Sequence, residues 1–383
     1  MKNKMKVSLL KYDSVQTLLA ALLCILGGLL IGYIVLLIIE PSGAWEAIVA
    51  VMKNFWRYPN EKLQLKYFGQ TLTRTAPLLM CALSVLFAYK VGMFNIGAAG
   101  QYVAGACAAL FFALYYKMPW YVCILAAMAA GALLGGLAGV LKSYCNVNVV
   151  ISGIMLNWIA LYLTNLILGV VKNPSSPYTK TLISVNDGAI LPSWGLNTLF
   201  NNEKSVTIAI PIALLAAVVV WVILNKTKFG YELKATGGNY HAAKYSGMKE
   251  NRNVILTMMI SGALAGLGAA LLYLTGIEEW ETTASSVPGM GFNGIAVAFL
   301  GGLSPIGSIL AGYFIQHITS GGGNVDLSVY CSQISSLISS LIIYLCAFVA
   351  FFKLMLQKRI RIREEKAAAA AVAQEKPEGG EAQ

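Results

Sequence analysis

The chain has 383 residues, of which 57% are hydrophobic and only 12% are charged. A soluble domain usually carries about 25% charged residues, so this composition excludes an ordinary soluble protein and indicates an integral membrane protein. The net charge of +11 comes mostly from residues at the ends of apolar runs. It therefore predicts orientation in the bilayer and contact with membrane lipid, and it does not predict binding to nucleic acid.

Long apolar runs predict a bundle of membrane-spanning helices, because a helix satisfies its own backbone hydrogen bonds in the bilayer. A basic segment at residues 1–14 precedes an apolar run at 15–39, which is too long for a signal-peptide core and is expected to remain as the first span. Residues 40–68 contain an amphipathic stretch and are predicted to form an extracellular loop. Four further spans of this half are predicted at residues 70–89, 102–116, 120–141 and 149–171.

The second half of the chain begins with a predicted extracellular loop at residues 172–205. A span at 206–224 leads to a basic segment at 226–252, whose six cations and two carboxylates predict a cytoplasmic position. Residues 288–299 are apolar but too few to cross a bilayer fully, so they predict a half-span or broken helix. Further crossings are predicted at 254–274, 306–318 and 330–352, with a glycine-rich loop at 319–326.

The predicted transmembrane region thus covers residues 15–352, and a tail at 353–383 follows it. The tail is basic at first, whereas its last part, 367–383, is low in complexity and has a composition typical of disorder. An even number of predicted crossings separates the three basic segments, so they can share the cytoplasmic side together with both termini. We expect an all-α fold of about ten transmembrane helices, and one or two of these are candidates for broken helices.

The distribution of charged residues and motifs separates several classes of membrane protein. All seventeen acidic residues fall in loops, tails or helix ends, whereas an ion-coupled carrier usually places a carboxylate midway through the membrane. The sequence has no phosphate-binding loop, so the chain is not expected to hydrolyse ATP alone. It also predicts no catalytic residue, no metal site and no bound cofactor, and its two histidines, His241 and His317, are expected to be polar fillers.

Two glycine-rich segments carry amide side chains at similar places in the two halves, one after the span at 70–89 and one after the span at 254–274. Glycine lets backbones approach closely, and amides offer donors and acceptors to a polar ligand. If the halves are inverted repeats, the two segments would meet near a central path. The alternative is close helix packing, with the amides bonding between helices. The candidate residues for a substrate path are Phe94, Asn95, Gly97, Gly100, Gln101, Asn157, Trp158, Phe292 and Asn293.

Four short motifs occur in order between residues 65 and 355. They are Asn95-Ile96-Gly97 with Gly100-Gln101, the run 152–157, Gly238-Asn239 with Ala242-Ala243 and Gly247, and the run 294–298 with Leu300-Gly301. As a set they resemble the permease subunits of bacterial ATP-binding-cassette (ABC) importers for simple sugars and nucleosides, and the nucleoside branch is the most similar. The family pattern has an acidic residue within the first motif, and this chain has Ala99 at that position instead.

The resemblance implies a transport subunit that is not itself an enzyme and lies in the bacterial plasma membrane. It implies a pore of two permeases, the second expected to be a different chain, with cytoplasmic ABC ATPase subunits that hydrolyse ATP and an extracellular substrate-binding lipoprotein. In such importers a short cytoplasmic helix of the permease docks on the ATPase. The coupling residues carried over are Gly238, Asn239, Ala242, Ala243 and Gly247. The rival hypotheses are a simple-sugar permease, an ion-coupled carrier and a membrane scaffold.

Overall fold

In the computed structural model of this chain, the structure describes residues 13–326, 329–330, 337–338, 340–341, 344–345 and 348–374. Over these residues it is helical, with two isolated β-bridges and no strand. Six helices in the described part are long and apolar enough to cross a membrane: α2 (Asp13–Ile39), α4 (Glu61–Lys90), α6 (Trp120–Cys145), α7 (Val149–Leu168), α9 (Ala209–Lys226) and α12 (Glu250–Tyr273). The prediction of an all-α, multi-pass membrane protein is confirmed.

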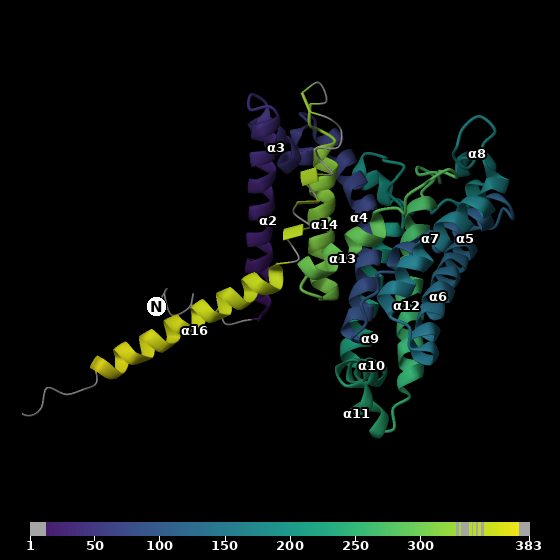
Figure 1. The fold of residues 1–383 in the computed structure, drawn as a ribbon. Helices are drawn as coiled ribbons and strands as arrows, with labels where there is room; N and C mark the ends of the chain where they lie inside the picture. Colours follow the sequence, from purple (N-terminus) through teal and green to yellow (C-terminus); the bar gives the residue numbers. More distant parts are fainter. Residues whose placement is uncertain are drawn as a thin grey trace, which may run out of the picture.

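Helix α4 lies at the centre of the bundle (Figure 1). It packs against α12, α9 and two shorter helices, α13 (Met290–Leu300) and α14 (Pro305–Gly322). Its apolar window is 89% buried, compared with 28% for that of α9. Helix α2 stands at the edge of the fold, where it contacts α3 (Ala44–Lys53). The predicted half-span at 288–299 is present as α13, which has only 11 residues.

Glycines allow α12 to pack very closely against α6 and α5 (Ala98–Leu114). A Cβ placed on Gly131 of α6 would lie 2.2 Å from the carbonyl oxygen of Gly262 on α12. A Cβ on Gly105 of α5 would lie 2.4 Å from the Cα of Gly266, one turn further along α12. Such backbone contact is typical of helix pairs in membranes. The hydrophobic effect does not drive helices together within lipid, so their association depends on close van der Waals packing, which small residues allow.

Helices α4 and α14 extend well beyond the spans predicted from the sequence. α4 begins at Glu61 rather than at residue 70, because the Asn60 side chain accepts a hydrogen bond from the Lys62 amide at 2.9 Å and caps a polar first turn. α14 continues to Gly322, so the prediction of a loop at 319–322 is wrong. Its glycines serve packing there, since a Cβ on Gly321 would lie 2.1 Å from the carbonyl oxygen of Val51 on α3.

The last described helix is α16 (Val349–Gln374), which extends away from the bundle (Figure 1). Of the span predicted at 330–352, residues 331–336, 339, 342–343 and 346–347 lie outside the described residues. Residues 367–374, predicted to be disordered, are helical, because alanine has the highest helix propensity of all residues. Side chains tie α16 to α2, with the Gln357 amide donating to Gln16 at 2.9 Å.

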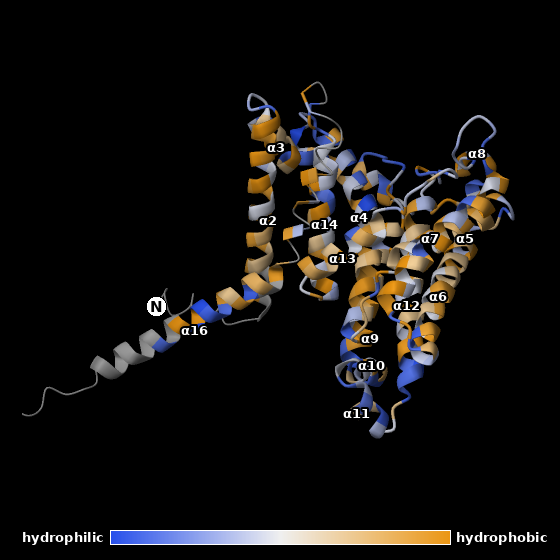
Figure 2. Ribbon diagram, viewed as in Figure 1, coloured by the Kyte–Doolittle hydropathy of each residue, from blue (hydrophilic) through white to orange (hydrophobic). Residues whose placement is uncertain are grey.

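Polar and apolar residues divide the fold into two ends and a middle (Figure 2). The middle parts of the long helices are hydrophobic, whereas α10 (Lys228–Gly238) and α11 (Tyr240–Tyr245) form a hydrophilic tip. The start of α2 and the start of α16 lie towards this same end (Figure 1). We call it the α10–α11 end, and the loops near α3 and α8 (Leu182–Val185) mark the opposite end.

Candidate functional sites

Segment 91–97 turns back from the end of α4 and delivers the first turn of α5 into the interior of the bundle. Gly92 has φ +76°, a left-handed conformation that glycine adopts without a steric cost. The Asn95 side chain is completely buried, and its Nδ2 donates to Gln101 Oε1 at 2.8 Å and to Ser261 Oγ at 2.7 Å. Ser261 lies near the middle of α12, and its hydroxyl donates to the Ser84 carbonyl of α4 at 2.8 Å. This polar cluster therefore connects α4, α5 and α12.

Asn157 of α7 holds the same segment from another side. Its Oδ1 accepts a hydrogen bond from the Gly100 amide at 2.7 Å, and its Nδ2 donates to the Ile96 carbonyl at 3.2 Å. The side chain is 3% exposed, so these bonds replace water almost completely. The structure thus brings together five predicted site residues: Asn95, Gly97, Gly100, Gln101 and Asn157. Their amides bond within the chain, which matches the packing alternative in this conformation.

The other four predicted path residues lie outside the polar cluster. Phe292 and Asn293 are exposed on one face of α13. The opposite face is packed: a Cβ on Gly291 would lie 2.4 Å from the Cα of Ala99. The two glycine-rich segments are therefore neighbours, although their asparagines face different surroundings. Of the remaining two, Trp158 is 43% exposed and stacks with Tyr162, and Phe94 is half-buried near Phe299.

We expect Asn157→Ala to lower the stability of the protein. The change leaves the Gly100 amide buried without a partner, which costs about 1–3 kcal/mol. Thermal unfolding of the purified variant in detergent measures this loss. Asn293→Ala is the matched control, because that side chain is exposed and makes no hydrogen bond to the described residues. Equal unfolding temperatures for wild type and Asn157→Ala would contradict the structural role.

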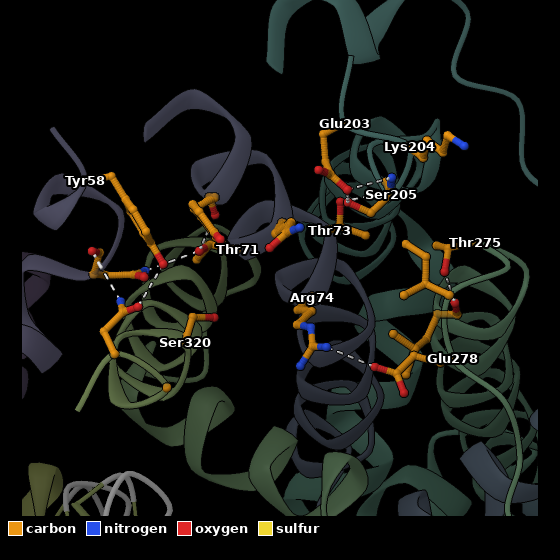
Figure 3. Close-up of a pocket in the computed structure, with 17 residues that line it drawn as sticks. Tyr58, Thr71, Thr73, Arg74, Glu203, Lys204, Ser205, Thr275, Glu278 and Ser320 are labelled. Carbon is orange, nitrogen blue, oxygen red and sulfur yellow. Dashed lines mark hydrogen bonds and ion pairs between the residues drawn. The ribbon is translucent and has the colours of Figure 1, made fainter. Parts of the chain in front are cut away.

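A polar cavity of about 430 Å³ lies at the opposite end from α10 and α11 (Figure 3). Sequence analysis missed it because its walls come from five separate segments of the chain. The lining residues are Asn54, Tyr58, Tyr67, Gln70, Thr71, Thr73, Arg74, Glu203, Lys204, Ser205, Leu272, Thr275, Ile277, Glu278, Ser320, Gly323 and Asn324. The sequence feature that could have indicated the cavity is the polar run 70–74 at the start of a predicted span.

Ion pairs and hydrogen bonds organise the walls of this cavity. Arg74 Nη2 lies 3.1 Å from Glu278 Oε1, and Figure 3 shows this pair across the cavity. The Thr73 hydroxyl donates to the Ser205 carbonyl at 3.1 Å, which joins α4 to the segment before α9. On another wall the rings of Tyr58 and Tyr67 are stacked, with centroids 4.1 Å apart. Burial raises the pKa of Tyr58 to about 12, so its phenol is neutral at physiological pH.

The five predicted coupling residues lie in or beside α10 and α11 and differ in their surroundings. Asn239 caps α11, since its Oδ1 accepts from the Ala242 amide at 2.9 Å. Ala243 is buried, and Gly247 has φ +78° in the turn that follows α11. Gly238, Asn239, Ala242 and Gly247 are exposed, whereas Ala243 packs inward. Asn239, Ala243 and Gly247 also shape the segment itself.

Helix α10 touches the segment that leads to the polar cluster. A Cβ on Gly237 would lie 2.2 Å from the carbonyl carbon of Val91, and a Cβ on Gly92 would lie 2.8 Å from the Gly237 oxygen. The Asn253 side chain of α12 donates to the Thr236 hydroxyl of α10 at 2.9 Å. α10 is therefore in backbone contact with the 91–92 turn and bonded to α12.

The fold and the sites define a multi-pass membrane protein of the permease type, with a helical tip joined to the interior of its bundle. Residues 67–348 match the protein family described as the permease component of the branched-chain amino acid transport system. The chain belongs to this family, whose members are permeases of ABC importers.

Three named relatives are similar to this chain. The guanosine ABC transporter permease protein NupP of Bacillus subtilis is 35% identical over 74% of this chain and 82% of its own. The nucleoside ABC transporter permease protein NupB of Lactococcus lactis is 30% identical over 93% of this chain and 97% of its own. The guanosine ABC transporter permease protein NupQ of Bacillus subtilis is 31% identical over 64% of this chain and 77% of its own.

Proposed function

We propose that this chain is the permease subunit of an ABC importer and forms part of the path for purine or pyrimidine nucleosides. The observation that carries this proposal is the similarity to NupB, which extends over 93% of the chain and is to a permease named for nucleosides. The similarity to NupP, named for guanosine, supports the same substrate class.

The proposal includes three partners. A separate ABC ATPase subunit hydrolyses ATP and docks on the exposed surface of α11, which includes Ala242. A second, different permease completes the pore, a view supported by the similarity of this chain to both NupP and NupQ of one organism. An extracellular lipoprotein delivers the nucleoside at the opposite end. In this arrangement both termini are cytoplasmic, because the basic segment 226–252 favours that side.

The contacts of α10 suggest how a movement of the ATPase reaches the path. A push on α11 moves α10, which bears directly on the 91–92 turn through Gly237. That turn continues into the segment held by Asn95 and Asn157. The exposed residues Phe292 and Asn293 lie on a helix that packs against the same segment, where they can face the nucleoside or the second permease. Differential binding of ATP would then bias two arrangements of this unit.

Uptake of radiolabelled guanosine and uridine by cells that carry the complete transporter tests the proposal. We expect uptake to require this chain and to disappear when the partner ATPase cannot hydrolyse ATP. A parallel assay with radiolabelled glucose and ribose tests the sugar alternative. Uptake of sugars without nucleosides would overturn the substrate class. Nucleoside uptake that survives loss of ATP hydrolysis and follows the proton gradient would overturn the importer mechanism.

We expect Ala242→Trp to detach the ATPase. Ala242 is exposed on α11, and an indole there would prevent a helix from seating closely in a partner cleft. Co-purification of the ATPase with the tagged permease measures the effect, and we expect most of the ATPase to be lost. Ser175→Trp introduces the same side chain at an exposed position at the opposite end and serves as control. Equal recovery of the ATPase with both variants would refute docking at α11.

A further inference from the structure

We propose that the polar cavity between α4, α14 and the 203–205 and 272–278 segments is a binding site for a neutral nucleoside. The inference rests on the proposed function and extends it, since it gives the permease its own recognition site for the substrate. The site would receive the nucleoside after the extracellular receptor releases it. Its chemistry predicts discrimination between nucleosides and their phosphorylated forms.

Charge is the first argument. Two of the lining residues are cationic, Arg74 and Lys204, and two are anionic, Glu203 and Glu278. Glu278 is paired with Arg74, and Glu203 lies 3.6 Å from Lys66 at the rim, so each carboxylate has a cation. A nucleotide phosphate would add negative charge beside two carboxylates. The lining cation that has no ion pair among the described residues, Lys204, is exposed, so solvent screens its attraction for a phosphate. An uncharged ligand avoids this cost.

Hydrogen-bonding capacity is the second argument. The Gln70 side chain makes no hydrogen bond to the described residues. Its amide oxygen can therefore accept from a ligand, and its amide nitrogen can donate to one. The hydroxyl oxygens of Thr71 and Thr275 line the same space and can accept from a ligand, since their protons are donated to backbone carbonyls. The carboxylate of Glu278 can also accept from hydroxyl groups (Figure 3). This mixture of donors and acceptors suits the ribose hydroxyls and the base edges of a nucleoside.

The third argument is shape. The volume of about 430 Å³ lies within the range of about 300–1,000 Å³ that is usual for small-molecule sites. The stacked rings of Tyr58 and Tyr67 add a planar aromatic surface to one wall. A nucleoside base can stack on such a ring. The cavity thus combines a place for the base with polar groups for the sugar.

Competition binding tests the inference, because one of the variants is expected to gain affinity for a nucleotide. The complete transporter, with its ATPase and both permeases but without the receptor, is placed in nanodiscs and titrated with radiolabelled guanosine. We expect saturable binding that guanosine 5′-monophosphate displaces poorly. In the double variant Glu203→Gln/Glu278→Gln the cavity is cationic, so the monophosphate should compete about tenfold better, which corresponds to about 1.4 kcal/mol.

Two further variants make the result specific. Glu279→Gln removes a carboxylate next to Glu278 that does not line the cavity, so it should leave the competition pattern as in wild type. Gln70→Ala should weaken guanosine binding about tenfold while leaving the thermal unfolding temperature unchanged, because its amide is not used in the fold. Unchanged competition by the monophosphate in the double variant, or unchanged guanosine binding in Gln70→Ala, would overturn the inference.

Uptake with the receptor present, measured with the same complexes reconstituted in sealed vesicles, separates the two proposals. Nucleoside uptake together with wild-type binding patterns in all variants would reject the cavity site and leave the proposed function standing. Absence of nucleoside uptake by the wild-type complex would reject the proposed function itself. Loss of receptor binding by the double variant, without a gain in monophosphate competition, would assign the cavity to receptor docking and reject the ligand site.

Discussion

Gly131→Ala is expected to destabilise the protein by about 3 kcal/mol or more, at the upper end of what added atoms in a packed interior usually cost. Helix propensity alone predicts the opposite, because alanine replacing glycine inside a helix normally stabilises by roughly 0.5–1 kcal/mol. The new Cβ would lie 2.2 Å from the Gly262 carbonyl oxygen, where an ordinary contact needs at least 3.4 Å. Since the obstacle is backbone, α6 and α12 must separate over several turns.

The measurement is thermal unfolding of the purified permease, together with its yield as a single species in size-exclusion chromatography. Gly169→Ala is the matched control, because no atom lies within 4 Å of the position that its Cβ would occupy. It should unfold at or slightly above the wild-type temperature. A wild-type or higher unfolding temperature for Gly131→Ala would show that the two helices are not held in backbone contact.

Gly237→Ala is expected to reduce ATP-driven transport per folded transporter, beyond any loss of folded protein that this backbone contact causes. The methyl group would occupy the space of the Val91 carbonyl carbon, so α10 and the 91–92 turn must move apart. On the proposed function this contact passes movement of the ATPase to the bundle. Coupling between sites is typically worth about 1–3 kcal/mol, or about 5- to 150-fold, so uptake should fall by a factor in this range.

Uptake and ATP hydrolysis are measured together in reconstituted vesicles. If the contact between α10 and segment 91–92 is disrupted, ATP hydrolysis should continue while transport falls. Gly238→Ala adds the same methyl group one residue later, where nothing lies within 4 Å, and it keeps the contact with Val91. We expect it to retain most transport. Equal losses of transport in Gly237→Ala and Gly238→Ala would assign the effect to the docking surface and not to the contact between α10 and segment 91–92.

Six of the predicted spans are present among the described residues as helices long and apolar enough to cross a bilayer, because length and apolar composition decide whether a helix can do so. Their ends were harder to predict. The start of α4 depends on a capping bond from Asn60, and its first turn is too polar to be recognised as part of a span. At α14, a glycine-rich segment that resembles a loop is helical because Gly321 packs against the backbone of α3.

For the candidate sites, too, the sequence identified individual residues but not the distant segments that contact them in the fold. The amide of Asn157 was visible in the sequence, but its partners, the Gly100 amide and the Ile96 carbonyl, are backbone groups of a distant segment. The polar cavity was not predicted, because no single segment contains enough of its wall to form a motif. Its key pair, Arg74 and Glu278, is separated by 204 residues in the chain.

Helix α13 has consequences for how such a transporter can diversify. Its packed face meets α5 through Gly291 and α4 through Gly294, so replacing either glycine disturbs the architecture. Its other face exposes Phe292 and Asn293. On the proposed function, substitutions on that face can therefore change specificity with little penalty in folding. One short helix would keep heritable variation in selectivity apart from the requirement to remain folded.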